Sequence, residues 1–276
     1  MNRSFHFIPG HQQRFLDRIP DLDADHIVLE LEDGVAGKDK AVARANIISW
    51  LGQNSAEGIW IRVNSADSEH GAADRELLSR LSTLPGIVVP KVEGPEAVSE
   101  LVRSLGGEAG SVRFIALLES FPALAKVSEI AAHPQVVGIG IGMEDLLSGT
   151  LHSKASQEWL MNSIKDKIVL GARAAGIVAI DTISTEIRDV PRFRDGCLCS
   201  RSHGFDGRFV IHPSQISVAN EVYGPDEEMV DWATRIEALT GLDSTLGYQN
   251  IGGELMSPPK INKARAILQA IRKQTR

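Results

Sequence analysis

Acidic side chains follow several short apolar runs of this sequence. Glu32 and Asp33 end one such run, Glu119 ends a second, and Asp145 stands shortly after a third. Carboxylates that meet in one cavity repel one another, so they are protonated, paired with cations or bound to a metal ion. Oxygen ligands without a cluster of Cys and His favour a hard cation, Mg²⁺ or Mn²⁺. The pattern therefore predicts a metal-assisted reaction.

Arg62 ends a further apolar run and is suited to binding a substrate anion. A guanidinium can hold a carboxylate through two parallel hydrogen bonds. A divalent cation nearby can polarise a carbonyl and stabilise the enolate that forms when the adjacent carbon–carbon bond breaks. Together these residues indicate chemistry at a carbon next to a carbonyl.

Each acidic residue also has a structural explanation. Glu32 and Asp33 could cap the segment that follows them and pair with Lys38 or Lys40. Asp145 could cap a helix that starts at Leu146. A strand-end carboxylate is more often a cap or an ion-pair partner than a ligand. The residues alone therefore leave a metal site and a set of local caps both open.

Other polar residues are interpreted in the same way. Lys91 could form a Schiff base, but its place after Pro90 and beside Glu93 favours a salt bridge. His212, which precedes Pro213, is interpreted as a structural histidine. The glycines of 138–142 lack the spacing of a dinucleotide-binding loop.

Eight short runs rich in Val, Ile and Leu recur along the chain and are predicted to be strands. They show little polar alternation, which is typical of parallel strands buried on both faces. Helical patterns fill the gaps, and eight strands that alternate with helices favour a closed (β/α)8 TIM barrel over an open doubly wound sheet. The predicted strands are 4–8, 26–31, 59–63, 86–89, 113–118, 136–141, 177–180 and 208–211.

Local residues predict where several helices begin and end. Pro residues begin the helices over 95–105 and 123–132, and Gly176 ends the helix over 156–175. In the helix over 40–51, one face is predicted to be buried. That face would carry Ala41, Ala45, Ile48 and Leu51.

The barrel is predicted to occupy residues 1–240 as the catalytic domain. Residues 241–276 form a C-terminal helical extension that begins with a stretch rich in Gly, Ser and Pro. Because it lies outside the eight repeating units, this extension is expected to pack on the barrel or on a neighbouring subunit.

Composition and charge exclude several classes of partner. The net charge of −7 is spread along 276 residues, whereas a nucleic-acid groove needs a clustered basic face. No apolar run reaches the roughly 18 residues of a membrane span. The N-terminus lacks the long apolar core of a signal peptide, and Cys197 and Cys199 are expected to be reduced. We therefore expect a cytoplasmic protein without a membrane partner.

Several motifs resemble the HpcH/HpaI aldolase–citrate lyase superfamily, in its branch of citrate lyase β-subunit-like proteins. Their order and spacing extend over more than 200 residues of the chain. The matching segments are 3–10 (Arg-Ser-Phe-His-Phe-Ile-Pro-Gly), 29–35 (Leu-Glu-Leu-Glu-Asp-Gly-Val), 61–64, 89–93, 116–120 (Ala-Leu-Leu-Glu-Ser), 142–146 (Gly-Met-Glu-Asp-Leu), 174–181, 204–208 and 211–216.

The resemblance implies a role for each site residue. Glu119 and Asp145 would bind Mg²⁺, or Mn²⁺ in its place. Arg62 would bind the carboxylate or carbonyl of the acyl group, and Glu32 and Asp33 would orient metal-bound waters and Arg62. The residues that would hold the thioester arm of coenzyme A or of an acyl carrier are Pro9, Gly10, Arg14, Lys40 and Arg44.

The activity implied is reversible cleavage of a 3-hydroxyacyl thioester, such as citryl-, malyl- or citramalyl-CoA, in a homotrimer or hexamer. Two departures from the family leave alternatives open. Glu30 stands where relatives usually have Asp, and Ser257 replaces a C-terminal Asp that serves some relatives as an acid or base. Water, Glu30, Glu32 or His6 would then have to move the proton. The alternatives are a pyruvate-type aldolase acting on free 2-keto acids and a non-catalytic acyl-binding subunit of a larger complex.

Overall fold

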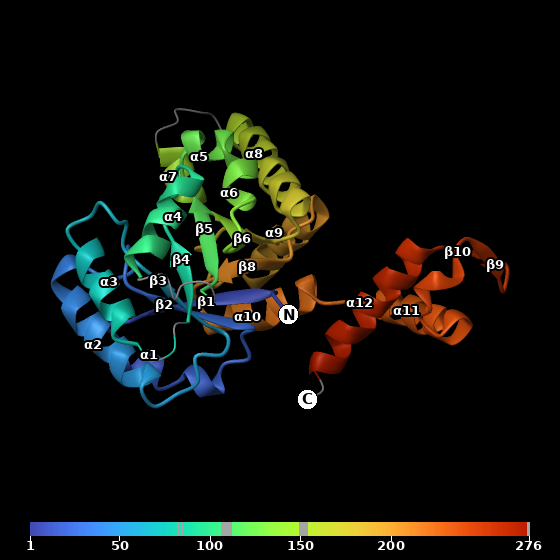
Figure 1. Cartoon of the computed structure of the whole chain (residues 1–276), viewed down its shortest axis with the longest axis horizontal. Coiled ribbons are helices and arrows are strands. Elements are labelled where there is room, and N and C mark those ends of the chain that lie inside the picture. Colours follow the sequence, from blue (N-terminus) through green and yellow to red (C-terminus); the bar gives the residue numbers. More distant parts are fainter. Residues whose placement is uncertain (82, 84, 106–111, 149–153, 275–276) are drawn as a thin grey trace. The chain divides into compact units, whose positions relative to one another are not determined.

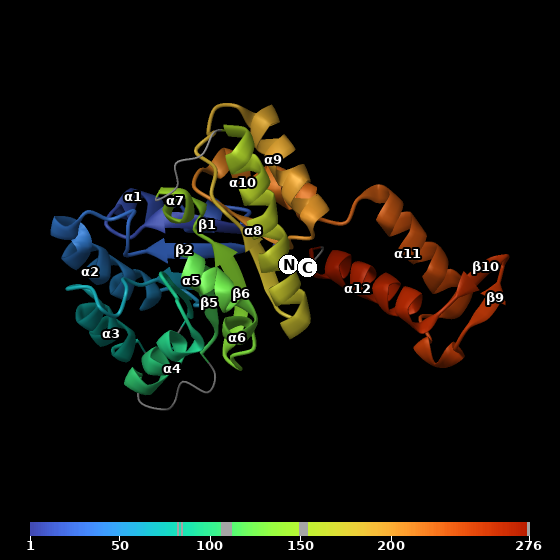
Figure 2. The same ribbon diagram turned by 90° about the horizontal axis from the view of Figure 1, so that it is seen from above.

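The first 220 residues fold around a closed ring of eight parallel strands. The computed structural model describes residues 1–81, 83, 85–105, 112–148 and 154–274. Each strand pairs with its neighbours in chain order, and β1 pairs with β8 to close the ring. Helices lie outside the strands (Figure 1 and Figure 2), so the predicted (β/α)8 TIM barrel is confirmed.

The strands coincide closely with the apolar runs of the sequence, with ends that differ by one residue or two. Their central residues are mostly buried. The strands are β1 (Ser4–Pro9), β2 (His26–Glu30), β3 (Ile59–Arg62), β4 (Gly86–Val89), β5 (Phe114–Leu118), β6 (Val136–Ile141), β7 (Val178–Asp181) and β8 (Gly207–Val210).

The helices include several that the sequence did not predict, chiefly α3, α9 and α10. The single helix expected over 123–132 is instead two short helices that meet at Lys126. The helices are α1 (Gln13–Leu16), α2 (Lys40–Leu51), α3 (Gly71–Ser79), α4 (Pro95–Ser104), α5 (Phe121–Ala125), α6 (Val127–Ala131), α7 (Met143–Ser148), α8 (Lys154–Ala175), α9 (Val190–His203), α10 (Pro213–Tyr223), α11 (Glu227–Thr240) and α12 (Pro258–Gln274).

The buried face of α2 differs from the face predicted. Ala43, Ile47 and Trp50 are buried, together with Lys40. Trp and Ile offer far more apolar area to the core than Ala does, so they determine which side of the helix turns inward.

Alternation along each strand separates the barrel interior from the layer between strands and helices. Side chains of successive strand residues point to opposite faces, so one set fills the ring and the next meets the helices. The inner core consists of Phe5, Val28, Trp60, Val88, Ile115, Leu117, Ile180 and Phe209. This packed core fills the interior of the ring. A site can therefore form only at an end of the barrel.

The chain divides into two compact units, Asn2–Asn220 and Glu221–Arg276, the second also including Met1. In the second unit α11 packs against α12 around a core that includes Ile236, Met256 and Ile261. A short antiparallel hairpin of β9 (Gln249–Ile251) and β10 (Glu254–Met256) joins them. The division falls 20 residues before the boundary expected at residue 240, because α11 belongs with α12. None of the helices in the described part of the chain has the length and apolar character to cross a membrane.

Candidate functional site

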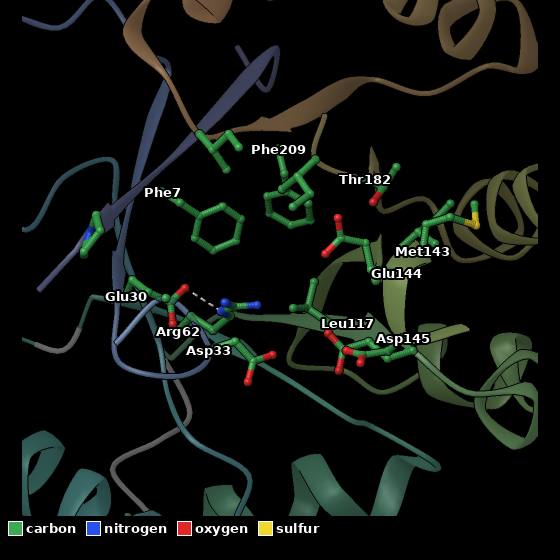
Figure 3. A pocket seen from close by; sticks show the side chains of 17 residues that line it. Phe7, Glu30, Asp33, Arg62, Leu117, Met143, Glu144, Asp145, Thr182 and Phe209 are labelled. Atoms are coloured by element: carbon green, nitrogen blue, oxygen red, sulfur yellow. Dashed lines mark hydrogen bonds and ion pairs between the residues drawn. The ribbon is translucent and has the colours of Figure 1, made fainter. Parts of the chain in front are cut away.

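A cavity of about 340 Å³ lies at the carboxyl-terminal end of the barrel strands (Figure 3). This is the end where enzymes of this architecture bind substrates. Six charged residues converge on it from the ends of β2, β3, β5 and β6. The lining residues are Phe7, Pro9, Glu30, Asp33, Gly34, Arg62, Leu117, Glu119, Ile141, Gly142, Met143, Glu144, Asp145, Thr182, Ile183, Phe209 and Ile211.

Arg62 is the cation among these lining residues, and its position is fixed from two sides. Its Nε donates to Glu30 Oε2 over 2.6 Å, and its Nη1 lies 3.3 Å from Glu32 Oε2. The guanidinium carbon lies 4.8 Å from the centre of the Phe7 ring. Burial acts to lower the pKa of Arg62, but the two carboxylates outweigh it and the pKa is raised. Arg62 therefore stays charged and presents a fixed guanidinium to the cavity.

Glu119 lies in a confined position at the end of β5. Its Oε2 accepts a hydrogen bond from the main-chain N–H of Lys91 over 3.0 Å. Burial and the nearby Glu32 carboxylate raise the pKa of Glu119 to about 7, with a smaller contribution from Asp145. A metal-free carboxyl group in this position is therefore protonated far more readily than an exposed one.

Asp145 lines the same cavity from α7 and is exposed. Because α7 begins at Met143, Asp145 lies within the first turn and does not cap a helix that starts at Leu146. Among the residues that the structure describes, no three His, Cys, Asp or Glu side chains are grouped to hold a metal ion. Glu119 and Asp145 are two of the carboxylates that line the cavity. They fit a hard cation that takes its other oxygens from water and substrate.

Glu32, Asp33 and Lys91 have different surroundings. Glu32 is buried beside the cavity, and its two oxygens lie near Arg62 Nη1 and, at 3.0 Å, near Lys91 Nζ. The salt bridge expected of Lys91 is therefore present, with Glu32 as its partner. Asp33 is exposed and lines the cavity.

The residues expected to hold a thioester arm are not brought together around one pocket. Pro9 lines the cavity, and Arg14 is exposed on α1. Gly10 is buried, and a Cβ atom at this position would lie 2.9 Å from Ile47 Cδ1. Gly10 thus allows close packing of β1 against α2.

Lys40 and Arg44 contact oxygens of the protein itself. Lys40 Nζ donates to the main-chain oxygens of Leu31 and Glu32 over 2.8 and 2.9 Å, and Arg44 Nε donates to Asp74 Oδ1 over 2.7 Å. Burial lowers the pKa of Lys40. Lys40 thus stabilises the segment after β2, and Arg44 joins α2 to α3. This leaves Arg14 as the exposed cation of the five residues.

Two polar residues of the barrel strands point away from the cavity because of strand alternation. His6 points out of the ring, where burial lowers its pKa to about 4, so it does not reach the cavity. Asp181 is fully buried and pairs with Lys165 and Arg208 at 3.4 and 3.1 Å. His212 is exposed and contacts Ser214.

The apolar side of the cavity was not predicted from the sequence. Phe7, Leu117 and Phe209 form its floor, and the rings of Phe7 and Phe209 lie 5.2 Å apart. Figure 3 shows the carboxylate of Glu144 turned toward the cavity on the side of Phe209. The signal that could have found the floor is the alternation itself, because Leu117 lies two residues before Glu119.

Comparison with known proteins adds independent information. The model of the HpcH/HpaI aldolase/citrate lyase family matches residues 3–213. A (3S)-malyl-CoA thioesterase of Cereibacter sphaeroides is 32% identical over 84% of this chain and 81% of its own length. The citrate lyase subunit beta of Haemophilus influenzae is 28% identical over 98% of this chain and 96% of its own length.

A solved structure shares the whole architecture. Protein CitE from Mycobacterium tuberculosis, in complex with magnesium, acetoacetate and coenzyme A, superposes with a TM-score of 0.75 at 28% identity. The match covers 97% of both chains.

Proposed function

Because the chain belongs to the HpcH/HpaI aldolase/citrate lyase family, we propose that it is a Mg²⁺-dependent carbon–carbon lyase. It cleaves, or in reverse forms, a 3-hydroxyacyl thioester of coenzyme A of the citryl, malyl or citramalyl type. The magnesium and coenzyme A bound by the CitE protein, and the malyl-CoA named for the thioesterase relative, support this substrate class.

The observation that carries the proposal is the convergence of Arg62 with two carboxylates on one cavity. Arg62 arrives from β3, Glu119 from β5 and Asp145 from α7. A guanidinium for a substrate carboxylate beside ligands for a divalent cation is the arrangement that retro-aldol chemistry at a 3-hydroxy acid requires.

The reaction can be written in balanced form. The C3 hydroxyl loses a proton, the C2–C3 bond breaks, and its electron pair becomes the enolate of the acetyl thioester. The enolate carbon then takes up a proton, and a 2-oxo acid remains. A bound Mg²⁺, held by Glu119 and Asp145, would stabilise negative charge on the carbonyl oxygens.

The chain's own residues bind the reactant and move the proton. Arg62 has five N–H donors, more than its two contacts use, so it can bind the substrate carboxylate. Glu30 lines the cavity and its pKa is raised, chiefly by burial, so it is placed to accept the hydroxyl proton. His6, considered for this role from the sequence, lies on the wrong face of β1.

The thioester arm approaches along the rim at Pro9 and Arg14, and Asp33 orients water at the same edge. We further propose a cytoplasmic homotrimer or hexamer, with residues 221–276 available for contacts between subunits.

The test is a substrate panel with the purified full-length chain. With Mg²⁺, coenzyme A esters of 3-hydroxy acids should be cleaved to acetyl-CoA and a 2-oxo acid, while free 4-hydroxy-2-oxo acids should not react. Glu119→Gln should abolish turnover, and Glu129→Gln, at an exposed position of α6, should preserve it. Cleavage of the free acids alone would instead identify a pyruvate-type aldolase. Binding of a thioester without turnover would identify a non-catalytic subunit.

A further inference from the structure

Lys91 adopts a backbone conformation that costs free energy for any residue with a side chain. Its φ is +53°, and in the described part of the chain it shares a positive φ with one other non-glycine residue, Leu242. Such strain persists only where surrounding structure imposes it, and it concentrates at functional sites. Glycine would adopt this conformation freely. A lysine at this position therefore points to a function for its side chain as well as its main chain.

The main chain of Lys91 holds Glu119. Its N–H lies 3.0 Å from Glu119 Oε2. A main-chain donor does not rotate as a side chain does, so it fixes one carboxylate oxygen of the proposed metal ligand. On the opposite side a Cβ atom at Gly142 would lie 2.3 Å from Glu119 Cγ. Glu119 is therefore confined between the Lys91 amide and Gly142.

The side chain of Lys91 holds a second carboxylate. Lys91 Nζ lies 3.0 Å from Glu32 Oε1, while Arg62 Nη1 lies 3.3 Å from Glu32 Oε2. Glu32 is buried and Lys91 is half exposed. The ammonium group thus keeps the Glu32 carboxylate next to Arg62. The negative charge of Glu32 in turn fixes the Arg62 guanidinium.

We infer that Lys91 is a positioning residue. Its main-chain amide orients Glu119, the proposed metal ligand, and its ammonium group acts through Glu32 to orient Arg62, the proposed binding residue for the substrate carboxylate. This role rests on the function proposed above and deepens it. Lys91 does not line the cavity, so its amine does not attack substrate. Its ammonium group is instead paired with the Glu32 carboxylate.

Four variants of the full-length chain separate the two contributions. Lys91→Met removes the charge at similar length, and Lys91→Arg restores it. Lys91→Gly removes the amine and accepts the positive φ, whereas Lys91→Val removes the amine and resists that φ. Lys38→Met, at an exposed position, is the matched control. Mn²⁺ affinity is measured by electron paramagnetic resonance, and KM and kcat with the thioester substrate.

The expected results differ for each contact. Lys91→Met raises KM about tenfold, the size of effect expected for groups that orient ligands, and Lys91→Arg recovers part of the loss. Lys91→Val loses about tenfold more Mn²⁺ affinity than Lys91→Gly. Equal Mn²⁺ affinity in Lys91→Gly and Lys91→Val would overturn the main-chain role. Unchanged KM in Lys91→Met would overturn the side-chain role.

Crystal structures of metal-free Lys91→Met and Lys91→Val separate this inference from the proposed function. Glu32 should turn away from Arg62 in the first variant, and Glu119 should shift in the second. If the wild-type chain bound no Mn²⁺, the proposed function would fail, while these shifts would still support the role of Lys91. Unmoved carboxylates in both variants would overturn that role whatever the metal does.

Discussion

Glu119 fits its place because residue 142 has no side chain. A Cβ atom at Gly142 would lie 2.3 Å from Glu119 Cγ and 2.7 Å from Glu119 Oε1, too close for any real contact. The main chain directly after β6 therefore forms one wall of the position of the proposed metal ligand.

Gly142→Ala should displace Glu119 and weaken Mg²⁺ binding by about 10–100-fold, the range for groups that orient metal ligands. Turnover should fall in parallel while the barrel remains folded. The control is Gly138→Ala, in β6 four residues earlier in the chain, where the new Cβ would lie 3.4 Å from Ile115 Cγ1, an ordinary contact. Calorimetry with Mg²⁺ measures both variants, and equal affinities would show that Gly142 does not shape the site.

The pH dependence of metal binding follows from the raised pKa of Glu119, about 7 in the metal-free protein. A metal binds the ionised carboxylate, so the Mg²⁺ affinity should rise about tenfold per pH unit below pH 7 and level off above it. Binding at pH 6 should release a proton, measured as a dependence of the calorimetric enthalpy on buffer. An affinity that stays flat between about pH 5.5 and about pH 7 would contradict the assignment of Glu119 as ligand.

The same group sets the sign of a stability change in metal-free protein. Because the folded-state pKa lies above the ordinary value of 4.5, the unfolded chain ionises Glu119 more easily. The free energy of unfolding should therefore fall as the pH rises from 4.5 through about 7. In Glu119→Gln this part of the decline should be absent, which urea titrations at several pH values would detect.

The order and type of the barrel strands could be predicted because each apolar run is long enough to be a buried strand and too short to be a helix. The acidic rim could be predicted for the same reason, since charge follows each run. Glu32, Glu119 and Arg62 lie together as expected from their positions at strand ends. Residue type alone does not show which side of a strand a polar residue occupies, and alternation turns His6 and Asp181 away from the cavity.

Other differences arise from packing that the sequence does not reveal. Ala is tolerated on any face of a helix, so the Ala-rich side of α2 gave a wrong prediction, and the areas of Ile47 and Trp50 decided its orientation. The contacts of Lys40 and Arg44 depend on Asn64 and Asp74, which lie far along the chain and meet them only in the fold. No local pattern carries such pairings.

The apolar floor predicts which acids the site prefers. Phe7 and Phe209 offer no partner to a second substrate carboxylate, and the burial of an unpaired charge is unfavourable. Pyruvate should therefore bind in the presence of Mg²⁺ at least about tenfold more tightly than oxaloacetate. Ile183→Lys should narrow or reverse that ratio, and Ile183→Met serves as the control of similar size. If the wild-type chain bound oxaloacetate more tightly than pyruvate, the apolar floor would not determine the preference between the two acids.

Ser257 offers a test of the C-terminal segment. It is buried directly before α12, and its main-chain oxygen accepts a hydrogen bond from the Ile261 N–H. A carboxylate can carry a proton near neutral pH and a hydroxyl cannot. Ser257→Asp should therefore raise turnover by about tenfold or add hydrolysis of the thioester product, and Ser257→Asn should do neither. Identical product profiles in all three proteins would separate this segment from the reaction.

Neighbouring residues of one strand are subject to different selection. In β8, Phe209 lines the cavity and would contact a bound substrate, whereas Arg208 forms an ion pair with Asp181 in the layer between the strands and the helices. Mutations that change substrate preference can accumulate at every second position without disturbing the ion pairs between the strands and the surrounding helices. A new specificity could thus evolve from a handful of alternate residues while the scaffold drifts independently.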